Sequence, residues 1–322
     1  MKRVLIDTDA GVDDAMAVAL AVASPELKIE AITVVSGNVD VDKSVRNMLL
    51  VLETLDVKTP PPVARGEAVP LSRPLLTAAN VHGADGVGGI TQMILPDGSR
   101  KYPDPSLSID PRPATQVIID LARYYGAELT LVTIGPLTNI ARAIERDREA
   151  MRMLGEIVIM GGAFRERGNT SRAAEFNIYV DPEAAQKTLD LGVPITIIPL
   201  DVTKQVRLMR SVVEKRLADK PSKALEFVRD VSSFYMDFHH RRDGFDGCFM
   251  HDPLTVGVAI DPTFVRTVAA KVSIETTDDL TRGVTRAELH PDRIQSTANA
   301  KVAVEVDADR FLSFFFDRLT GL

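Results

Sequence analysis

The chain has 322 residues, of which 45% are hydrophobic and 26% charged, a composition typical of globular proteins rather than disordered ones. Its 38 basic and 45 acidic side chains leave a formal net charge of −7, so we expect neither nucleic acid nor an anionic membrane as a partner. Cys248 is the single cysteine, which excludes a disulfide within the chain, and no apolar stretch is long enough to complete a signal peptide or to cross a membrane, so we expect a cytoplasmic protein.

Short apolar runs alternate with amphipathic segments, and this pattern predicts the secondary structure. In chain order we expect a strand at residues 4–6, a helix at 14–20, a strand at 29–35, a helix at 41–55, a helix at 114–125, a strand at 129–134, a helix at 137–146, a strand at 157–160, a helix at 182–191 and a strand at 195–199. The remainder should contain a helical segment at 211–242 broken near Pro221, strands at 270–275 and 302–306, and a helix at 310–319.

The repeated order of strand, helix and strand predicts the fold class. Parallel strands joined by helices form right-handed units, and uninterrupted runs of Val, Ile and Leu fit a sheet that is covered on both faces. We therefore expect an α/β fold with a doubly wound, mostly parallel central sheet of the Rossmann-like kind and additional helices. Neither a linker nor an internal repeat interrupts the pattern, so residues 1–322 should form a single domain.

Four carboxylates, those of Asp7, Asp9, Asp13 and Asp14, follow directly after the first predicted strand. In open α/β sheets ligands bind at the carboxyl ends of the strands, where this loop should lie. Crowded carboxylates repel one another unless a cation intervenes, and such hard oxygen ligands favour Ca²⁺ or Mg²⁺ over zinc. The alternative is that these residues are helix N-terminal acids and turn residues, which explains only part of the cluster. No glycine-rich phosphate loop follows this strand, which argues against nucleotide-phosphate binding.

Residues 7–15, with the sequence DTDAGVDDA, resemble the N-terminal signature of the nucleoside hydrolase family, the inosine–uridine preferring group and its relatives. Further segments resemble that family in the same order along the chain: SGN at 36–38, HGADG at 82–86, IGPLTN at 134–139, MGG at 160–162, GN at 168–169, AEFN at 174–177 and HDP at 251–253. The resemblance covers residues 4 to about 260. It implies an enzyme that hydrolyses the N-glycosidic bond of ribonucleosides and releases the free base and ribose.

The same resemblance implies one calcium ion per subunit at the floor of a ribose pocket. Its ligands would be Asp9, Asp14, Asp252 and the backbone carbonyl of Ile134, completed by water and two ribose hydroxyls. Three carboxylates, a carbonyl and water oxygens form the cage that Ca²⁺ prefers. Asp9 would be the general base that takes a proton from the metal-bound water, with a role as ligand alone as the alternative. Asp7 is expected to orient other groups rather than to bind the metal.

The family pattern also assigns side chains around the sugar. Alternation along an extended segment predicts that Glu175 and Asn177 face the ribose hydroxyls while Phe176 faces the other side, with an exposed polar edge as the alternative. Met160 would form one wall of the sugar site. The candidate substrate-binding residues on this side are Asp13, Asn38, Met160, Asn169, Glu175, Phe176 and Asn177.

Histidine and tyrosine side chains are candidates for contact with the departing base. His251 lies beside Asp252 and has a side chain that can donate a proton near neutrality, so we assign it as the general acid. His82 in the glycine-rich segment either contacts substrate or packs its loop. Tyr235 and His239 share one face of a predicted helix at 232–240 and could contact or protonate the base, unless that helix is packed by its aromatic residues with His239 at the surface. The preferred base stays open.

Two other functions compete with this interpretation. A Mg²⁺-dependent phosphohydrolase of the haloacid-dehalogenase type also begins with a strand and an Asp-x-Asp pair, with Asp7 as nucleophile and Asp9 as acid and base, but Gly11 and the adjacent Asp13 and Asp14 depart from its pattern. A non-catalytic nucleoside or ribose binder would lack the base or a metal ligand, whereas every expected position is filled. The family resemblance further suggests a homodimer or homotetramer.

Overall fold

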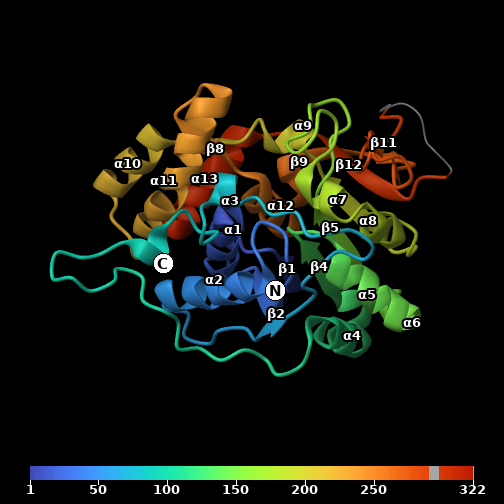
Figure 1. The fold of residues 1–322 in the computed structure, drawn as a ribbon, viewed down its shortest axis with the longest axis horizontal. Coiled ribbons are helices and arrows are strands. Elements are labelled where there is room, and N and C mark those ends of the chain that lie inside the picture. Colours follow the sequence, from blue (N-terminus) through green and yellow to red (C-terminus); the bar gives the residue numbers. More distant parts are fainter. Residues whose placement is uncertain (290–296, 322) are drawn as a thin grey trace.

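The structure, a computed structural model, describes residues 1–289 and 297–321, and an eight-stranded sheet runs through its centre (Figure 1). The neighbouring strands, from one edge of the sheet to the other, are β3 (Val63–Arg65), β2 (Leu27–Val34), β1 (Lys2–Thr8), β4 (Leu129–Thr133), β5 (Glu156–Met160), β6 (Ile195–Ile198), β12 (Ala300–Val306) and β9 (Val265–Ala270). Every neighbouring pair is parallel except β12 and β9, which run antiparallel. The mostly parallel, doubly wound α/β fold predicted from the sequence is confirmed.

Successive side chains of each central strand point to opposite faces of the sheet. Because the side chains on both faces are apolar, helices cover both. In β1, Val4 and Ile6 belong to one apolar core and Leu5 to the other. The first core is covered by α1 (Val12–Val22), α2 (Val41–Thr54), α11 (Lys223–Asp243), α12 (His251–Ile260) and α13 (Ala308–Leu319). The second is covered by α4 (Ala114–Tyr125), α5 (Thr138–Arg146), α6 (Arg148–Met151) and α8 (Pro182–Leu189).

The shorter elements lie mainly in the connections. They are the helices α3 (Ala79–His82), α7 (Phe176–Val180), α9 (Leu200–Thr203) and α10 (Arg210–Asp219), the 3₁₀ turns Ile90–Gln92, Gly126–Glu128 and Pro262–Phe264, and the two-stranded pairs β7 (Arg207–Met209) with β8 (Gly247–Phe249) and β10 (Ser273–Ile274) with β11 (Thr285–Arg286). β7 precedes α10 and α11 in the chain and β8 follows them, so the β7–β8 pair joins the two ends of this helical segment. β8 then leads directly into α12.

Most predicted elements end within a few residues of the observed ones, and the predicted break near Pro221 separates α10 from α11. The strand predicted at 270–275 is wrong. β9 pairs with β12 from Val265 to Ala270, and the chain then leaves the sheet to form β10, because its next partner is the short β11. Among the described residues no helix combines the length and apolarity that a membrane span requires. That the whole chain forms one domain stays a prediction.

Candidate active site

A cavity opens at the carboxyl ends of the central strands. Ile134 follows β4, Met160 ends β5 and Asp13 lies just beyond β1, and all three line the cavity. All of the predicted site residues except Asp9 and Asp14 belong to its lining, namely Asp13, Asn38, His82, Ile134, Met160, Asn169, Glu175, Phe176, Asn177, Tyr235, His239, His251 and Asp252. Asp9 and Asp14 are fully buried and reach this lining through Asn38, whose amide Nδ2 lies 3.1 Å from a carboxylate oxygen of each.

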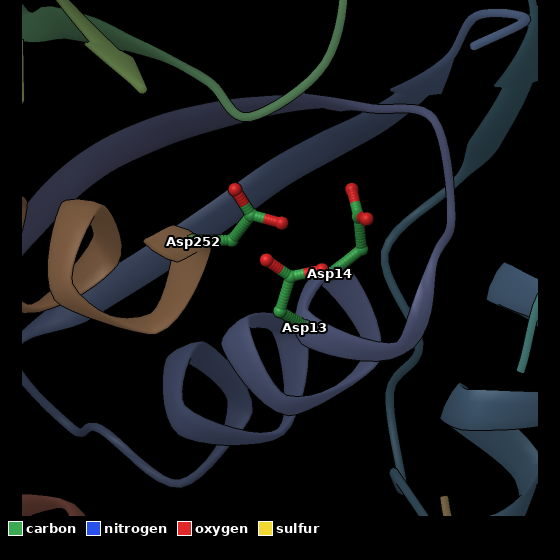
Figure 2. A group of neighbouring side chains, drawn as sticks. All are labelled: Asp13, Asp14 and Asp252. Atoms are coloured by element: carbon green, nitrogen blue, oxygen red, sulfur yellow. The ribbon is translucent and has the colours of Figure 1, made fainter. Parts of the chain in front are cut away.

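The floor of the cavity is a cluster of carboxylates from distant parts of the chain (Figure 2). Asp13 and Asp14 lie in the first turn of α1, Asp252 lies in the first turn of α12, and these two helices pack against each other. Each of the three offers a carboxylate oxygen, and these oxygens lie within 4.8 Å of one another. The packing of α1 on α12 therefore brings Asp252 next to Asp13 and Asp14, although more than 200 residues separate them in the sequence.

The loop before α1 is held in an unusual conformation. Ala10 has a φ of 50°, in the left-handed region that disfavours a residue with a Cβ, and such conformations concentrate at functional sites. Two side chains of α2 hold it in place: Ser44 Oγ donates to the Asp9 carbonyl over 3.0 Å, and Asn47 Nδ2 donates to the Ala10 carbonyl over 3.1 Å. The helix that packs beside α1 thus fixes the backbone that carries the acidic residues.

Asp9 sits in a cradle that only glycine permits. A Cβ on Gly37 would lie 2.0 Å from Asp9 Oδ2, and a Cβ on Gly135 would lie 2.8 Å from the Asp9 backbone nitrogen. The backbone N–H of Asn38 donates to Asp9 Oδ2 over 2.7 Å. Asp14 is held as firmly, since Thr8 Oγ1 and the Gly11 N–H donate to its two oxygens over 2.5 and 2.7 Å. These bonds give both carboxylates one orientation.

Burial raises the pKa of every carboxyl group in the cluster, and at Asp14 hydrogen bonds from Thr8 and Gly11 oppose that rise. The pKa values of Asp9 and Asp252 lie well above their ordinary range, and that of Asp13 is raised to about 8, in each case first by burial and then by neighbouring carboxylates. The nearest ion-pair candidate is His82, whose Nδ1 lies 3.9 Å from Asp13 Oδ1. Burial lowers the pKa of His82 to about 3, so this ring is neutral and supplies no countercharge.

The donor set fits a metal ion. It consists of oxygens from three buried carboxylates, those of Asp13, Asp14 and Asp252. The Ile134 carbonyl, expected as a further ligand, accepts a hydrogen bond from Asn177 Nδ2 at 3.3 Å. A divalent cation would neutralise charges that otherwise repel one another, and hard cations take such all-oxygen sets. Asp13, Asp14 and Asp252 could therefore hold a metal ion, with Asp9 beside them.

The sugar side differs from the prediction in one element. Residues 175–177 were expected to be extended, but Glu175 is the N-cap of α7 and accepts the backbone N–H groups of Asn177 and Ile178 over 2.8 and 3.1 Å. Because the chain turns into a helix here, Phe176 lines the same cavity as its two neighbours, and the prediction that it faces away is wrong. Side-chain capping of the helix by a glutamate outweighs the alternation that the sequence suggested.

Asn169 and Asn177 tie this helix to the strands. Asn169 Oδ1 accepts the Phe176 N–H over 2.8 Å, and Asn177 Nδ2 spans the carbonyls of Ile134 and Met160, each at 3.3 Å. Burial raises the pKa of Glu175 to about 7, although backbone N–H groups oppose the shift. This side of the cavity is therefore a fixed set of polar groups around the ends of β4 and β5.

Aromatic rings of α11 form the opposite wall. Tyr235 stacks on His82 with ring centroids 5.2 Å apart, and it meets His239 edge-on at 4.5 Å. Tyr235 and His239 are 3% and 5% exposed, so the alternative of a surface His239 is wrong, whereas its neighbour His240 is exposed. The helical spacing of four residues places both side chains of α11 on the cavity, as predicted.

Each histidine of the wall has one ring nitrogen engaged. His82 Nδ1 accepts the Val12 N–H over 3.1 Å, so the neutral ring carries its proton on Nε2. His251 Nδ1 bonds Thr203 Oγ1 at 2.6 Å, and burial lowers the pKa of His251 well below its ordinary value. His239 Nδ1 bonds a carboxylate of its own helix. The remaining ring nitrogens are the ones left for a ligand.

Several lining residues were missed from the sequence: Ala78, Val81, Thr170, Lys204, Phe238, Arg242, Asp243 and Phe249. Phe249 could have been found, because it lies two residues before His251 in a short strand. Thr170 adjoins Asn169, and Arg242 and Asp243 follow Tyr235 and His239 at helical spacing, so these positions also carried a sequence signal. Ala78, Val81 and Lys204 reach the cavity through tertiary packing. Asp7, expected to orient other groups, is fully buried behind the floor and accepts from Thr33 and Asn139 over 2.5 and 2.7 Å.

Comparison with known proteins places this geometry in a family. Residues 4–313 match the model of the inosine-uridine preferring nucleoside hydrolase family. A pyrimidine-specific ribonucleoside hydrolase, RihA, of Photobacterium profundum is 38% identical over 99% of both chains. A purine-preferring ribonucleoside hydrolase from Gardnerella vaginalis superposes with a TM-score of 0.89 at 34% identity, over 99% of this chain and 98% of that one. A plant nucleoside hydrolase, the PpNRh1 enzyme, also gives 0.89 at 34% identity, over 100% and 99%. The chain therefore belongs to the inosine-uridine preferring nucleoside hydrolase family.

Proposed function

We propose that this protein is a calcium-dependent ribonucleoside hydrolase, which adds water across the N-glycosidic bond and releases free base and ribose. Family membership supports the hydrolase activity. The names of similar proteins disagree on the base, pyrimidine in one case and purine in another, and agree on the ribonucleoside. We therefore assign ribonucleosides as the substrate class.

One observation carries the proposal. Buried carboxylates from the first turn of α1 and from α12 converge at the floor of a cavity whose other walls offer amide groups on one side and aromatic rings on the other. A carboxylate cluster suits a cation and a sugar diol, amides suit hydroxyl groups, and aromatic rings suit a flat base. The three chemical parts of a nucleoside hydrolysis site thus lie side by side.

The proposed calcium ligands are Asp9, Asp14, Asp252 and the carbonyl of Ile134, with Asp13 within reach of the same place. Calcium is favoured over zinc because every donor is a hard oxygen, without sulfur or imidazole. When bound, the ion supplies positive charge that lowers the pKa of a coordinated water and attracts the ribose hydroxyls.

Asp9 is the proposed general base. It is the carboxylate most enclosed by the backbone, and Asn38 fixes both of its oxygens, so it can receive the water proton in one defined geometry. In the metal-free protein, burial and the charge of Asp14 raise the pKa of Asp9. The remaining side chains on this side, Asp13, Asn38, Asn169, Glu175 and Asn177, would hold ribose hydroxyls, with Met160 as a wall.

The step itself balances simply. The bond between C1′ and the base nitrogen breaks with its electron pair on the base, water oxygen bonds to C1′, and one water proton passes to Asp9. Carboxylate and amide oxygens around the sugar stabilise the positive charge that grows on C1′ and the ring oxygen. The base acquires a proton, for which His251, His239, Tyr235 and His82 are the candidate donors on the wall.

The two rival functions find no support in this geometry. A phosphohydrolase would need Asp7 as an accessible nucleophile, but this carboxylate is buried and hydrogen-bonded to Thr33 and Asn139. A binding protein without catalysis has no need for Asp9 in a cradle beside the diol site. A homodimer or homotetramer and a cytoplasmic location stay predictions.

A substrate panel tests the proposal. Purified protein is incubated with inosine, adenosine, guanosine, uridine and cytidine, and released ribose and base are measured before and after chelation and after calcium is restored. We expect turnover of at least one ribonucleoside, loss of that turnover with chelator, and recovery with Ca²⁺. Release of phosphate from sugar phosphates, or turnover that chelation leaves intact, would contradict it.

A further inference from the structure

We propose that Asp243 is a positioning residue that holds His239 so that its Nε2–H donates to the departing base. The inference rests on the proposed function, because it concerns the leaving group of that reaction. Asp243, which ends α11 and lies four residues after His239, was not among the residues predicted from the sequence.

The carboxylate and the ring form a short, defined pair. Asp243 Oδ2 lies 2.6 Å from His239 Nδ1, and both side chains line the cavity. Because a carboxylate accepts hydrogen bonds, Nδ1 carries a proton and the ring has one orientation. His239 Nε2 is buried and has no hydrogen-bond partner in the part of the chain that the structure describes. A buried nitrogen without a partner, on a ring that lines a cavity, still needs a hydrogen-bond partner, and we assign the base to that place.

Neighbouring rings keep this histidine from turning. Tyr235 and Phe249 meet its ring edge-on with centroids at 4.5 and 4.8 Å, and Phe245 stacks on it at 5.8 Å. The Asp243 bond and these three contacts together fix where Nε2 points. This degree of fixation suits proton transfer, which needs a donor aligned with its acceptor.

Asp243 also favours the protonated ring. Burial lowers the pKa of His239, and the positive charges of Arg242 and Lys204 lower it further. The hydrogen bond and the charge of Asp243 raise it. The other titratable groups that face it are Tyr235 on its own helix and the neutral rings of His82 and His251 from other elements. Asp243 is therefore the one group of this set whose charge stabilises imidazolium.

The step needs no further reactant. The C1′–N bond breaks with its electron pair on the base, the base takes the Nε2 proton, and His239 is left neutral with its Nδ1–H still on Asp243. Solvent at the open end of the cavity returns the proton. The contribution of Asp243 should therefore appear only with bases that must be protonated to leave.

The test compares two substrates in two variants. One substrate is the best ribonucleoside of the panel, and the other is 4-nitrophenyl β-D-ribofuranoside, whose leaving group departs as an anion without a proton. The variant D243N removes the charge, and D237N is the matched control, because Asp237 lies on the same helix but is exposed and pairs with Arg210. Melting temperatures verify that each variant is folded, and D243E, which restores a carboxylate, guards against a purely structural loss.

We expect D243N to lower kcat/KM for the ribonucleoside about 10- to 100-fold and to leave the nitrophenyl riboside within about twofold. The fall of ribonucleoside activity with rising pH should begin at lower pH in D243N, because the His239 pKa drops further. D243E should recover part of the loss, and D237N should match the wild type. An equal loss on both substrates, or an unchanged ribonucleoside rate, overturns the inference. A wild-type protein inactive on both substrates would instead contradict the proposed function.

Discussion

The floor and the wall of the cavity are built on different principles. The floor consists of carboxylates, and two of them, Asp9 and Asp14, are held by backbone N–H groups and by Asn38 next to glycines that leave no room for a side chain. The wall consists of rings on α11 and its neighbours that stack or meet edge to face, and among the described residues it leaves His239 Nε2 buried without a hydrogen-bond partner. Charge is concentrated on the floor and directional contact on the wall. We therefore expect chemistry on the sugar and choice of base to depend on separate elements.

This separation predicts two classes of variant. A change in the floor should reduce turnover of every ribonucleoside by the same factor, because all of them share the ribose. A change in the wall should alter the ratio between bases and leave metal affinity as it was.

The largest effect is expected from Asp9→Asn, which should lower kcat about 10⁴-fold on every ribonucleoside, because the water loses its proton acceptor. The variant should stay folded, since a neutral amide replaces a buried charge that is already disfavoured. Steady-state rates and a melting curve measure both. Asp42→Asn is the control, because Asp42 is an exposed carboxylate paired with Arg65. A loss confined to one base would break the proposed division between floor and wall.

The sugar diol provides the next largest effect. A 2′-deoxyribonucleoside should show kcat/KM about 100-fold lower than the matching ribonucleoside, because it lacks one hydroxyl that the cation and carboxylates hold. The comparison uses uridine with 2′-deoxyuridine and inosine with 2′-deoxyinosine under saturating calcium. Comparable values within either pair would show that the floor does not grip the diol.

On the wall, Tyr235→Phe should change the ratio of kcat/KM between uridine and inosine about tenfold, because it removes one polar contact beside the base. Calcium affinity should be unchanged, since the ring and its stacking on His82 are retained. Calorimetric titration of the metal alongside the two rates separates the effects. Equal loss on both nucleosides together with weaker calcium binding would mean that the wall supports the floor.

The smallest effect concerns stability in the absence of metal. The pKa values of Asp7 and Glu175 are raised to about 7 and that of Asp13 to about 8, so the folded chain binds more protons than the unfolded chain above pH 4. Stability from these groups is therefore present at low pH and is lost as pH rises to about 8. The chelated protein should melt at a lower temperature at pH 8 than at pH 5. Calcium should raise the melting temperature more at pH 8, and the opposite order would contradict the raised values.

The floor could be predicted from the sequence more fully than the wall. The acidic loop after the first strand pointed to Asp13 and Asp14, and the family resemblance supplied Asp252, which packing brings beside them. The wall depends on which face of a 21-residue helix meets the cavity. Helical spacing related Tyr235 to His239, but the contact of Asp243 with the same ring is a matter of side-chain orientation at the helix end.

The failed predictions have one local and one non-local cause. Alternation misled at Phe176 because the Glu175 carboxylate caps a helix, and that competition between backbone and side chain is not visible in a hydrophobic pattern. The strand at 270–275 was misplaced because its pairing partners, β12 and β11, lie elsewhere in the chain. Strand ends in such cases depend on partners that the segment itself does not contain.

Our central claim is that one divalent cation is shared by carboxylates from the start of the chain and from α12. A crystal structure grown with calcium tests it most directly. The account predicts a single ion with oxygen ligands at about 2.3–2.6 Å from Asp9, Asp14, Asp252 and the Ile134 carbonyl. An ion that binds without Asp252, or a cavity floor that takes up no calcium at saturating concentration, would contradict it.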